Sequence, residues 1–221
     1  MKITAIQYGK TTLGGNFVWE GGDENVRYPI ALLFFCVQTE DKTILVDVGC
    51  DVMHGFEVTD HVSPVVALRN AGIQAEDVTD VVLTHGHEDH AEAVHYYPNA
   101  TITVHKNETY RAKRYTAQNQ VLNEIDGEFS LCKGVTVVPM LGHSQGSCIV
   151  EIQTKDGIIV LCGDECYHKD CFQSPARSGG SIHRQNTLAF FEKYGRSEYQ
   201  KILFHDPKLV GKTGHKDIYE Q

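Results

Sequence analysis

Three histidines and one aspartate lie within six residues of the chain, at His85, His87, Asp89 and His90. Imidazole nitrogens and carboxylate oxygens are the donors that zinc and similar divalent ions accept together. Four such side chains crowded on one turn would lack partners unless a cation lies among them. The spacing therefore predicts a metal site, and we disfavour the alternative of a merely polar, histidine-rich surface loop.

The residues on either side of this turn indicate how the fold positions it. Val81-Val82-Leu83, directly before the turn, is an apolar run typical of a buried strand. Ala91-Glu92-Ala93-Val94, directly after it, is typical of the start of a helix. The turn should then lie at the carboxyl end of a strand, where α/β sheets place their active sites.

Three more donor side chains, His143, Asp164 and His205, each come just after an apolar run. If the strands predicted by those runs share one sheet edge, all three side chains meet the first turn. Seven donors are too many for one tetrahedral ion and suit two ions. His143 alone would be read as an ordinary histidine, so the prediction of a dinuclear site depends on the combination.

The rest of the chain predicts an α/β fold. The run 30–38 is apolar without polar alternation, which favours a strand buried on both faces. Strands are predicted at 2–8, 30–38, 43–47, 80–83, 101–104, 134–138, 148–152, 157–162 and 201–204, and helices at 63–72, 107–126 and 184–194. We see no linker or repeat, so the pattern predicts a single domain over residues 1–221, with helices covering the sheet faces.

Composition excludes several function classes. The chain has 221 residues and a formal net charge of −9, which argues against a nucleic-acid partner because phosphate binding needs a basic excess. No apolar stretch approaches the length of a membrane span. The amino-terminal residues lack the apolar core of a signal peptide. We therefore expect a cytoplasmic protein whose seven cysteines are mostly buried, reduced thiols.

Taken together, these segments resemble the metallo-β-lactamase superfamily. The matching residues are Thr84–His90, Gly142–Ser147, Gly163-Asp164 and Phe204–Asp206, with Ile44–Gly49 similar to the family's early strand. The resemblance runs from about residue 30 to residue 207 and implies an αββα sandwich, two β-sheets between outer helix layers. It also implies that His85, His87 and His143 hold one metal, that Asp89, His90 and His205 hold the second, and that Asp164 bridges both.

Within the superfamily, the motif is most similar to that of the N-acyl homoserine lactonases. Tyr167 lies three residues after Asp164, where a lactonase tyrosine binds the substrate carbonyl and stabilises the oxyanion. Two ions sharing a water make it a hydroxide at neutral pH, and this bridging hydroxide attacks a lactone or ester carbonyl. Asp89 then accepts or passes the proton. A packed Tyr167 with a satisfied hydroxyl is the alternative.

Several points stay open at this stage. Thioester hydrolysis of the hydroxyacylglutathione type and phosphodiester hydrolysis are alternatives, and so is a non-enzymatic metal-binding redox or sensor protein using Cys162, Cys166 and Cys171. Asp47 either orients a metal-bound histidine or caps its loop. Phe17-Val18-Trp19, in a glycine-flanked mobile loop, either packs in the core or forms a hydrophobic wall for substrate.

The expected cofactor is a pair of divalent ions. Zinc is favoured, and manganese or iron(II) would suit the same donors. The expected partner is a small-molecule substrate, and a homodimer is possible.

Overall fold

The computed structural model of the chain describes residues 1–172 and 178–221. In this part of the chain the strands form a seven-stranded and a five-stranded sheet. The larger sheet runs in the order β12 (Gly214–Glu220), β1 (Lys2–Gly14), β2 (Arg27–Gln38), β3 (Thr43–Val46), β4 (Asp80–Leu83), β5 (Thr101–His105) and β6 (Val121–Ile125). The smaller runs β11 (Tyr199–Ile202), β10 (Gly157–Leu161), β9 (Cys148–Thr154), β8 (Val135–Pro139) and β7 (Phe129–Cys132).

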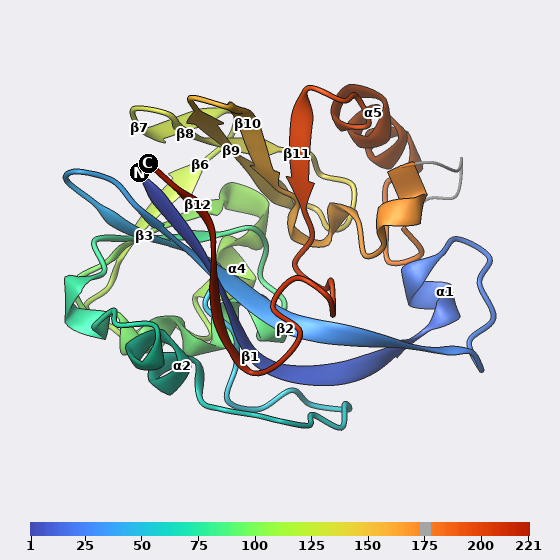
Figure 1. Cartoon of the computed structure of the whole chain (residues 1–221), viewed down its shortest axis with the longest axis horizontal. Helices are drawn as coiled ribbons and strands as arrows, with labels where there is room; N and C mark the ends of the chain where they lie inside the picture. The colour runs from blue at the N-terminus through green and yellow to red at the C-terminus, as the bar shows by residue number, and fades with distance from the viewer. Residues whose placement is uncertain (173–177) are drawn as a thin grey trace.

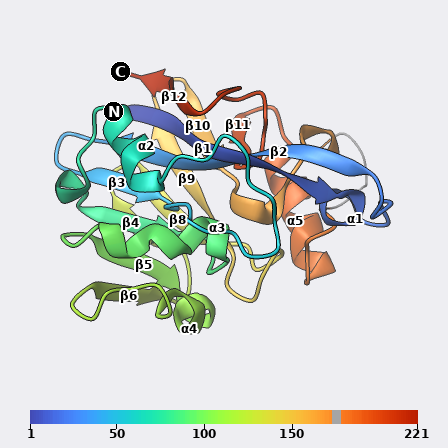
Figure 2. The same cartoon turned by 90° about the horizontal axis from the view of Figure 1, so that it is seen from below.

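Helices cover the outer face of each sheet. The α-helices are α1 (Gly15–Val18), α2 (Pro64–Asn70), α3 (Glu88–Ala91), α4 (Thr109–Ala112) and α5 (Arg184–Tyr194). The 3₁₀ turns are η1 (Ala75–Asp77), η2 (Glu92–Tyr96), η3 (Lys106–Glu108), η4 (Gly163–Glu165) and η5 (Lys169–Phe172). Figure 1 places α2 and α5 on opposite sides of the two sheets, and Figure 2 shows α2, α3 and α4 along one face of the larger sheet. The layers confirm the predicted αββα sandwich.

Strand β2 shows why the apolar run carries no polar alternation. Leu32 and Phe34 point into the core between the larger sheet and its helices, with Leu68 of α2 and Val94 of η2. The residues that alternate with them, such as Phe35, point into the core between the sheets. Because both faces of the strand are covered, every position favours an apolar side chain.

The smaller sheet packs its other face against α5. Phe190 and Tyr194 of this helix are fully buried against Ile149 of β9 and Val160 of β10. The predicted bounds of this helix, Arg184 to Tyr194, are confirmed, and Gly195 follows it directly. Helix α2 likewise begins at Pro64 as predicted, and Gly72 follows it with a φ of 83° that glycine tolerates.

The predicted helix over 107–126 is wrong. Only η3 and α4 are helical there, while 121–125 form β6, which pairs in parallel with β5. Strand β6 lies at the edge of the larger sheet and carries Asn123 and Glu124, so its sequence shows no apolar run. A polar edge strand is typical, because an exposed apolar edge invites pairing with other chains.

One strand is longer than predicted, and two strands were not predicted. Strand β1 continues to Gly14, well beyond residue 8, and Phe17 and Val18 belong to the short helix α1. The sequence prediction missed β7 and β12. Strand β12 pairs antiparallel with β1, with Lys2 opposite Glu220, so both chain ends lie side by side (Figure 1).

Candidate metal centre

The 84–90 turn begins where β4 ends, as predicted. Thr84 is held against Asp47, which follows β3: its backbone N–H donates to Asp47 Oδ1 at 2.7 Å, and its hydroxyl donates to Asp47 Oδ2 at 2.7 Å. Strands β3 and β4 are parallel neighbours, so their carboxyl ends deliver both residues to the same sheet edge.

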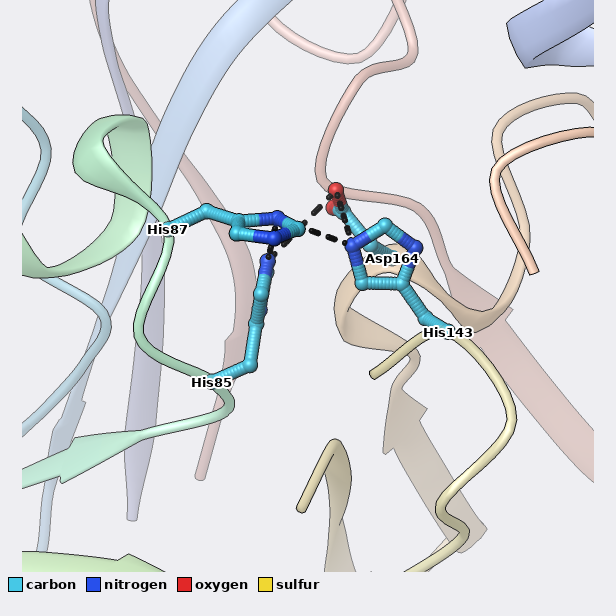
Figure 3. Close-up of side chains that lie close together, drawn as sticks. All are labelled: His85, His87, His143 and Asp164. Carbon is cyan, nitrogen blue, oxygen red and sulfur yellow. Dashed lines mark hydrogen bonds and ion pairs between the residues drawn. The ribbon is translucent and has the colours of Figure 1, made fainter. Parts of the chain in front are cut away.

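Four of the predicted ligands converge in one group, His85, His87, His143 and Asp164 (Figure 3). His87 Nδ1 lies 2.9 Å from His85 Nε2 and 3.0 Å from His143 Nε2. Asp164 Oδ2 lies 3.8 Å from His85 Nε2 and 3.5 Å from His143 Nε2. These atoms come from three separate segments of the chain and point at a common centre.

The other three predicted ligands, Asp89, His90 and His205, form a second group beside the first. Asp164 Oδ1 faces this group, 3.1 Å from His90 Nε2 and 3.0 Å from His205 Nε2. Asp89 Oδ2 lies 3.6 Å from His90 Nε2 and 3.8 Å from His205 Nε2. Asp164 thus presents one carboxylate oxygen to each group, which is the arrangement that a bridging ligand requires.

The donor chemistry of both groups fits divalent cations. Burial lowers the pKa of His143 to about 4, and burial also lowers the pKa of His85 and His87, so these rings are neutral. Three neutral imidazoles with nitrogens about 3 Å apart cannot all donate to one another, whereas one cation accepts all three lone pairs. At the second group, His90 Nε2 and Asp164 Oδ1 are buried as an ion pair 3.1 Å apart, and neither atom has a hydrogen bond of good geometry to any described residue.

Asp47 acts on the second group directly. Its Oδ2 lies 2.6 Å from His90 Nδ1, so the carboxylate accepts from the ring nitrogen opposite the one that faces Asp164. A carboxylate in this place fixes the tautomer and orientation of a metal-binding histidine. Burial lowers the pKa of His90, but the carboxylates of Asp164, Asp89 and Asp47 together raise it well above its ordinary value.

Tyr167 lines the same cavity as Asp164 and contacts its carboxylate. Its hydroxyl donates to Asp164 Oδ2 at 2.6 Å, and its ring stacks on His205 with centroids 5.3 Å apart. Burial and the neighbouring Asp164 raise the pKa of Tyr167 well above its ordinary value, so the phenol keeps its proton at neutral pH. The side chain is therefore a hydrogen-bond donor at the centre.

A cavity of about 320 Å³ opens onto both ligand groups. Its floor carries His87, Asp89, His143, Asp164 and His205, and its walls are largely apolar, formed by Leu13, Phe17, Ile30, Met53 and Phe56. Phe17 thus lines the cavity, while Trp19 packs at the edge of the core against Tyr28 and His168. Such a largely apolar pocket with polar groups at one end suits a small organic ligand.

Two buried glutamates that the sequence did not indicate border the ligand loops. Glu165 accepts from the backbone N–H of Gly142 and of His143, each at 3.2 Å, and from the Ser147 hydroxyl. Glu108 is also buried and accepts hydrogen bonds from Ser144 and Gly146 of the same loop. Glu165 adjoins Asp164 in sequence, which was a usable signal, but nothing in the residues around Glu108 marks it.

The three cysteines near Asp164 lie in the apolar core under α5. Cys162, Cys166 and Cys171 are free, buried thiols packed with Phe190 and Tyr194. Burial raises the pKa of Cys162 to about 12, so its thiol stays protonated. Neither group of metal-type donors found in residues 1–172 and 178–221 includes a cysteine.

A model of the metallo-beta-lactamase superfamily matches residues 33–187. The chain belongs to this superfamily. The match covers both parallel strands at the first ligand turn, the His143 loop and Asp164, so membership agrees with the geometry of the centre.

Individual relatives are similar over most of the chain. The N-acyl homoserine lactonase AiiB of Agrobacterium fabrum is 24% identical over 216 residues, covering 78% of each protein. A solved N-acyl homoserine lactone hydrolase, with the product N-hexanoyl-L-homoserine at its catalytic metal centre, superposes with a TM-score of 0.82 at 19% identity over 95% of each chain. The dizinc quorum-quenching lactonase AidC superposes with a TM-score of 0.69 at 16% identity, covering 99% of this chain and 94% of that one.

Proposed function

We propose that the chain is a dinuclear metal-dependent hydrolase that opens a lactone or another ester, as N-acyl homoserine lactonases do. The observation that carries this proposal is the pair of donor groups that share Asp164 at the floor of an apolar cavity. In this assignment His85, His87 and His143 would hold one ion, Asp89, His90 and His205 would hold the other, and Asp164 would serve both.

The residues divide the chemistry between them. When bound, the ion pair supplies a water activated at neutral pH and an electrophilic partner for the carbonyl oxygen. Tyr167 donates its phenol proton in a hydrogen bond to that oxygen as negative charge develops on it. Asp89 takes the proton from the attacking water and returns it to the leaving oxygen as the acyl carbon–oxygen bond breaks. A lactone gives a single hydroxy acid, and an acyclic ester gives an acid and an alcohol.

The apolar walls of the cavity indicate that the non-reacting part of the substrate is hydrophobic. Leu13, Phe17, Met53 and Phe56 surround space next to the ligand groups, so an acyl chain can be buried there while its carbonyl faces Tyr167. The similarity to enzymes named N-acyl homoserine lactonases supports a lactone as the first substrate to test.

A substrate panel with metal control tests the proposal. The full chain is assayed on N-acyl homoserine lactones, simple esters, a hydroxyacylglutathione-type thioester and a phosphodiester, before and after chelation and after zinc is restored. We expect lactone or ester hydrolysis that chelation abolishes and zinc restores. His87→Ala and Asp164→Asn should abolish turnover while the circular dichroism spectrum stays native. Full activity in the chelated protein or in either variant would refute the proposal, and preferred turnover of the thioester or phosphodiester would reassign the substrate.

Other assignments follow from the same donor set. We propose zinc as the resident ion, because nitrogen and oxygen donors suit it and a similar fold binds two zinc ions, and metal analysis distinguishes it from manganese or iron.

We also propose one domain over 1–221 and, from seven free thiols, a reducing, cytoplasmic compartment. In the described part of the chain no helix is long and apolar enough to cross a bilayer. The homodimer stays a prediction, which light scattering tests.

A further inference from the structure

We propose that Glu108 is a positioning residue that holds the two histidine-bearing loops of the first ligand group in place. Its side chain is completely buried at the end of η3, and it is not one of the donors that face a metal. The inference rests on the proposed ligand roles of His85, His87 and His143, and it assigns a task to a residue outside them.

Each carboxylate oxygen of Glu108 serves a different loop. Oε2 accepts from the backbone N–H of Gly86 at 3.1 Å, and Gly86 lies between His85 and His87. Oε1 accepts from the Ser144 hydroxyl at 2.8 Å and from the Gly146 N–H at 3.0 Å, in the loop that carries His143. One buried side chain therefore ties together two ligand loops that lie far apart in the sequence.

The close approach of backbone to Glu108 explains two glycines. A Cβ on Gly86 would lie 2.5 Å from Arg111 Cβ and 3.1 Å from Glu108 Oε2. A Cβ on Gly146 would lie 2.7 Å from His105 Nδ1 and 2.9 Å from Glu108 Cγ. Each glycine would have at least one contact shorter than 3.0 Å, which real Cβ atoms essentially never show, so a side chain at either position would push its loop away from Glu108.

The contacts require a carboxylate rather than an amide. All four partners of Glu108 are donors: two backbone N–H groups, the Ser144 hydroxyl and the Arg111 guanidinium, whose Nη1 lies 3.3 Å from Oε2. A glutamine of the same shape would turn an NH₂ group toward one of these donors and lose at least one contact. Glu108→Gln therefore alters the hydrogen bonding while keeping the volume of the side chain.

This arrangement should hold His85, His87 and His143 near their metal-binding geometry before a metal arrives. Groups that orient metal ligands from outside the coordination sphere typically change metal affinity by about 10–100-fold when they are replaced. Glu108 acts through the backbone of the loops and not on the imidazoles themselves, so we expect an effect of about tenfold, at the lower end of that range.

The test compares Glu108→Gln with Glu124→Gln, an exposed glutamate on β6 that pairs with Lys113 and contacts neither loop. Zinc affinity of the metal-free full chain is measured by competition with a chromogenic chelator, and amide hydrogen exchange is followed at Gly86 and Gly146. We expect Glu108→Gln to bind the first zinc about tenfold more weakly and to exchange both amides faster. Glu124→Gln should match the parent protein in both measurements.

Glu108→Gln with parental zinc affinity and parental protection of both loop amides would overturn the proposal. If that variant does not fold, Ser144→Ala decides, because it removes one hydrogen bond to Oε1 and keeps the glutamate. Weaker zinc binding in Ser144→Ala supports the role, and unchanged binding overturns it. Zinc affinity is measured without any substrate, so a failure here is distinct from a failure to hydrolyse lactones.

Discussion

Asp164 is the residue on which both donor groups depend, and its geometry limits what can replace it. Its two oxygens face opposite groups, with Oδ1 near His90 and His205 and Oδ2 near His85 and His143. Asparagine would present one NH₂ group, which cannot bind a cation. The same oxygen that faces the first group also accepts from Tyr167, so the tyrosine is tied to the centre even without substrate.

Replacing Tyr167 with phenylalanine should slow turnover without removing metal. The variant keeps the ring that stacks on His205 but loses the buried donor at the cavity. Loss of one oxyanion donor typically lowers kcat by about 10²–10³-fold, and we expect between roughly tenfold and a thousandfold here. Steady-state kinetics on the best lactone or ester, with metal content measured on the same sample, check this. An unchanged kcat at full metal content would remove Tyr167 from the chemistry.

Replacing Asp47 with asparagine should weaken metal binding at the second group. Asp47 accepts from Thr84 and from His90, so an amide would turn an NH₂ group toward at least one donor. Asp47 has a φ of 59°, a conformation that asparagine also tolerates, so the backbone should be retained. We expect roughly 10–100-fold weaker binding of one of two ions.

Zinc titration of metal-free Asp47→Asn, compared with the parent chain, measures that change. Binding of the other ion serves as the internal control, since Asp47 contacts His90 and forms no hydrogen bond or ion pair with His85, His87 or His143. Parental affinity for both ions would show that Asp47 only shapes the loop after β3, which is the capping role left open by the sequence.

At the scale of the elements, the loop between β8 and β9 should tolerate no side chain at Gly146. A Cβ there would press on His105 and Glu108, and the loop would have to move with His143. Overpacking of a filled site typically costs about 1–3 kcal/mol. We expect Gly146→Ala to lower the free energy of unfolding by about that amount and to weaken zinc binding.

Gly127→Ala is the matched control, because an added Cβ at Gly127 meets no atom within 4 Å. Chemical denaturation of both variants, each metal-free, separates the packing effect from any effect of bound zinc. If Gly146→Ala were as stable as Gly127→Ala and bound zinc equally well, the prediction would be wrong. The tight packing of the loop against Glu108 would then contribute neither to stability nor to zinc affinity.

A helix, strand or turn could be predicted when the residues that mark it lie within one stretch of sequence. The 85–90 turn and the helix 184–194 were predictable because spacing, flanking apolar runs and Gly195 lie within one stretch of sequence. The run 30–38 was predictable because burial on both faces leaves it uniformly apolar. Strands β6 and β12 were missed because each lies at an edge of the larger sheet and carries polar residues.

The residues of the site also divide into those that the sequence marks and those that only the folded structure reveals. The seven predicted ligands follow strands or sit on the first turn, so one assumption, a shared sheet edge, brings them together. Glu108 gives no such signal, because its partners Gly86 and Gly146 lie 22 and 38 residues away in the chain. Its burial is a property of the assembled loops, and no pattern within its own segment reports it.

At the scale of the whole molecule, buried negative charge gathers around the centre. Asp47, Glu108, Asp164 and Glu165 are all buried at the ligand loops, in a chain of net charge −9. Burial raises the pKa of Glu165 to about 7. Among the lysines and arginines that the structure describes, only Arg111 forms an ion pair with one of these carboxylates, that of Glu108. Such a site favours divalent cations, since their charge offsets carboxylates that burial would otherwise destabilise.

The two donor groups should load metal over different pH ranges. In the metal-free chain, burial lowers the pKa of His143 to about 4 and also lowers those of His85 and His87, so protons compete little with a cation at the first group. Burial lowers the pKa of His205 as well, but Asp164 and Asp89 raise it above its ordinary value, and they do the same for His90. A cation must displace those protons, so affinity at the second group falls as pH falls.

We therefore expect that, between about pH 8 and about pH 6, the affinity for the second zinc ion falls more steeply than the affinity for the first. Calorimetry in two buffers of different ionisation enthalpy should show that the second ion releases protons near neutral pH and that the first releases few. His90→Gln should abolish the second step and leave the first at low pH. If both ions bound with equal affinity at both pH values, this prediction would be contradicted. That result would mean that the nearby carboxylates do not keep His90 and His205 protonated in the metal-free chain.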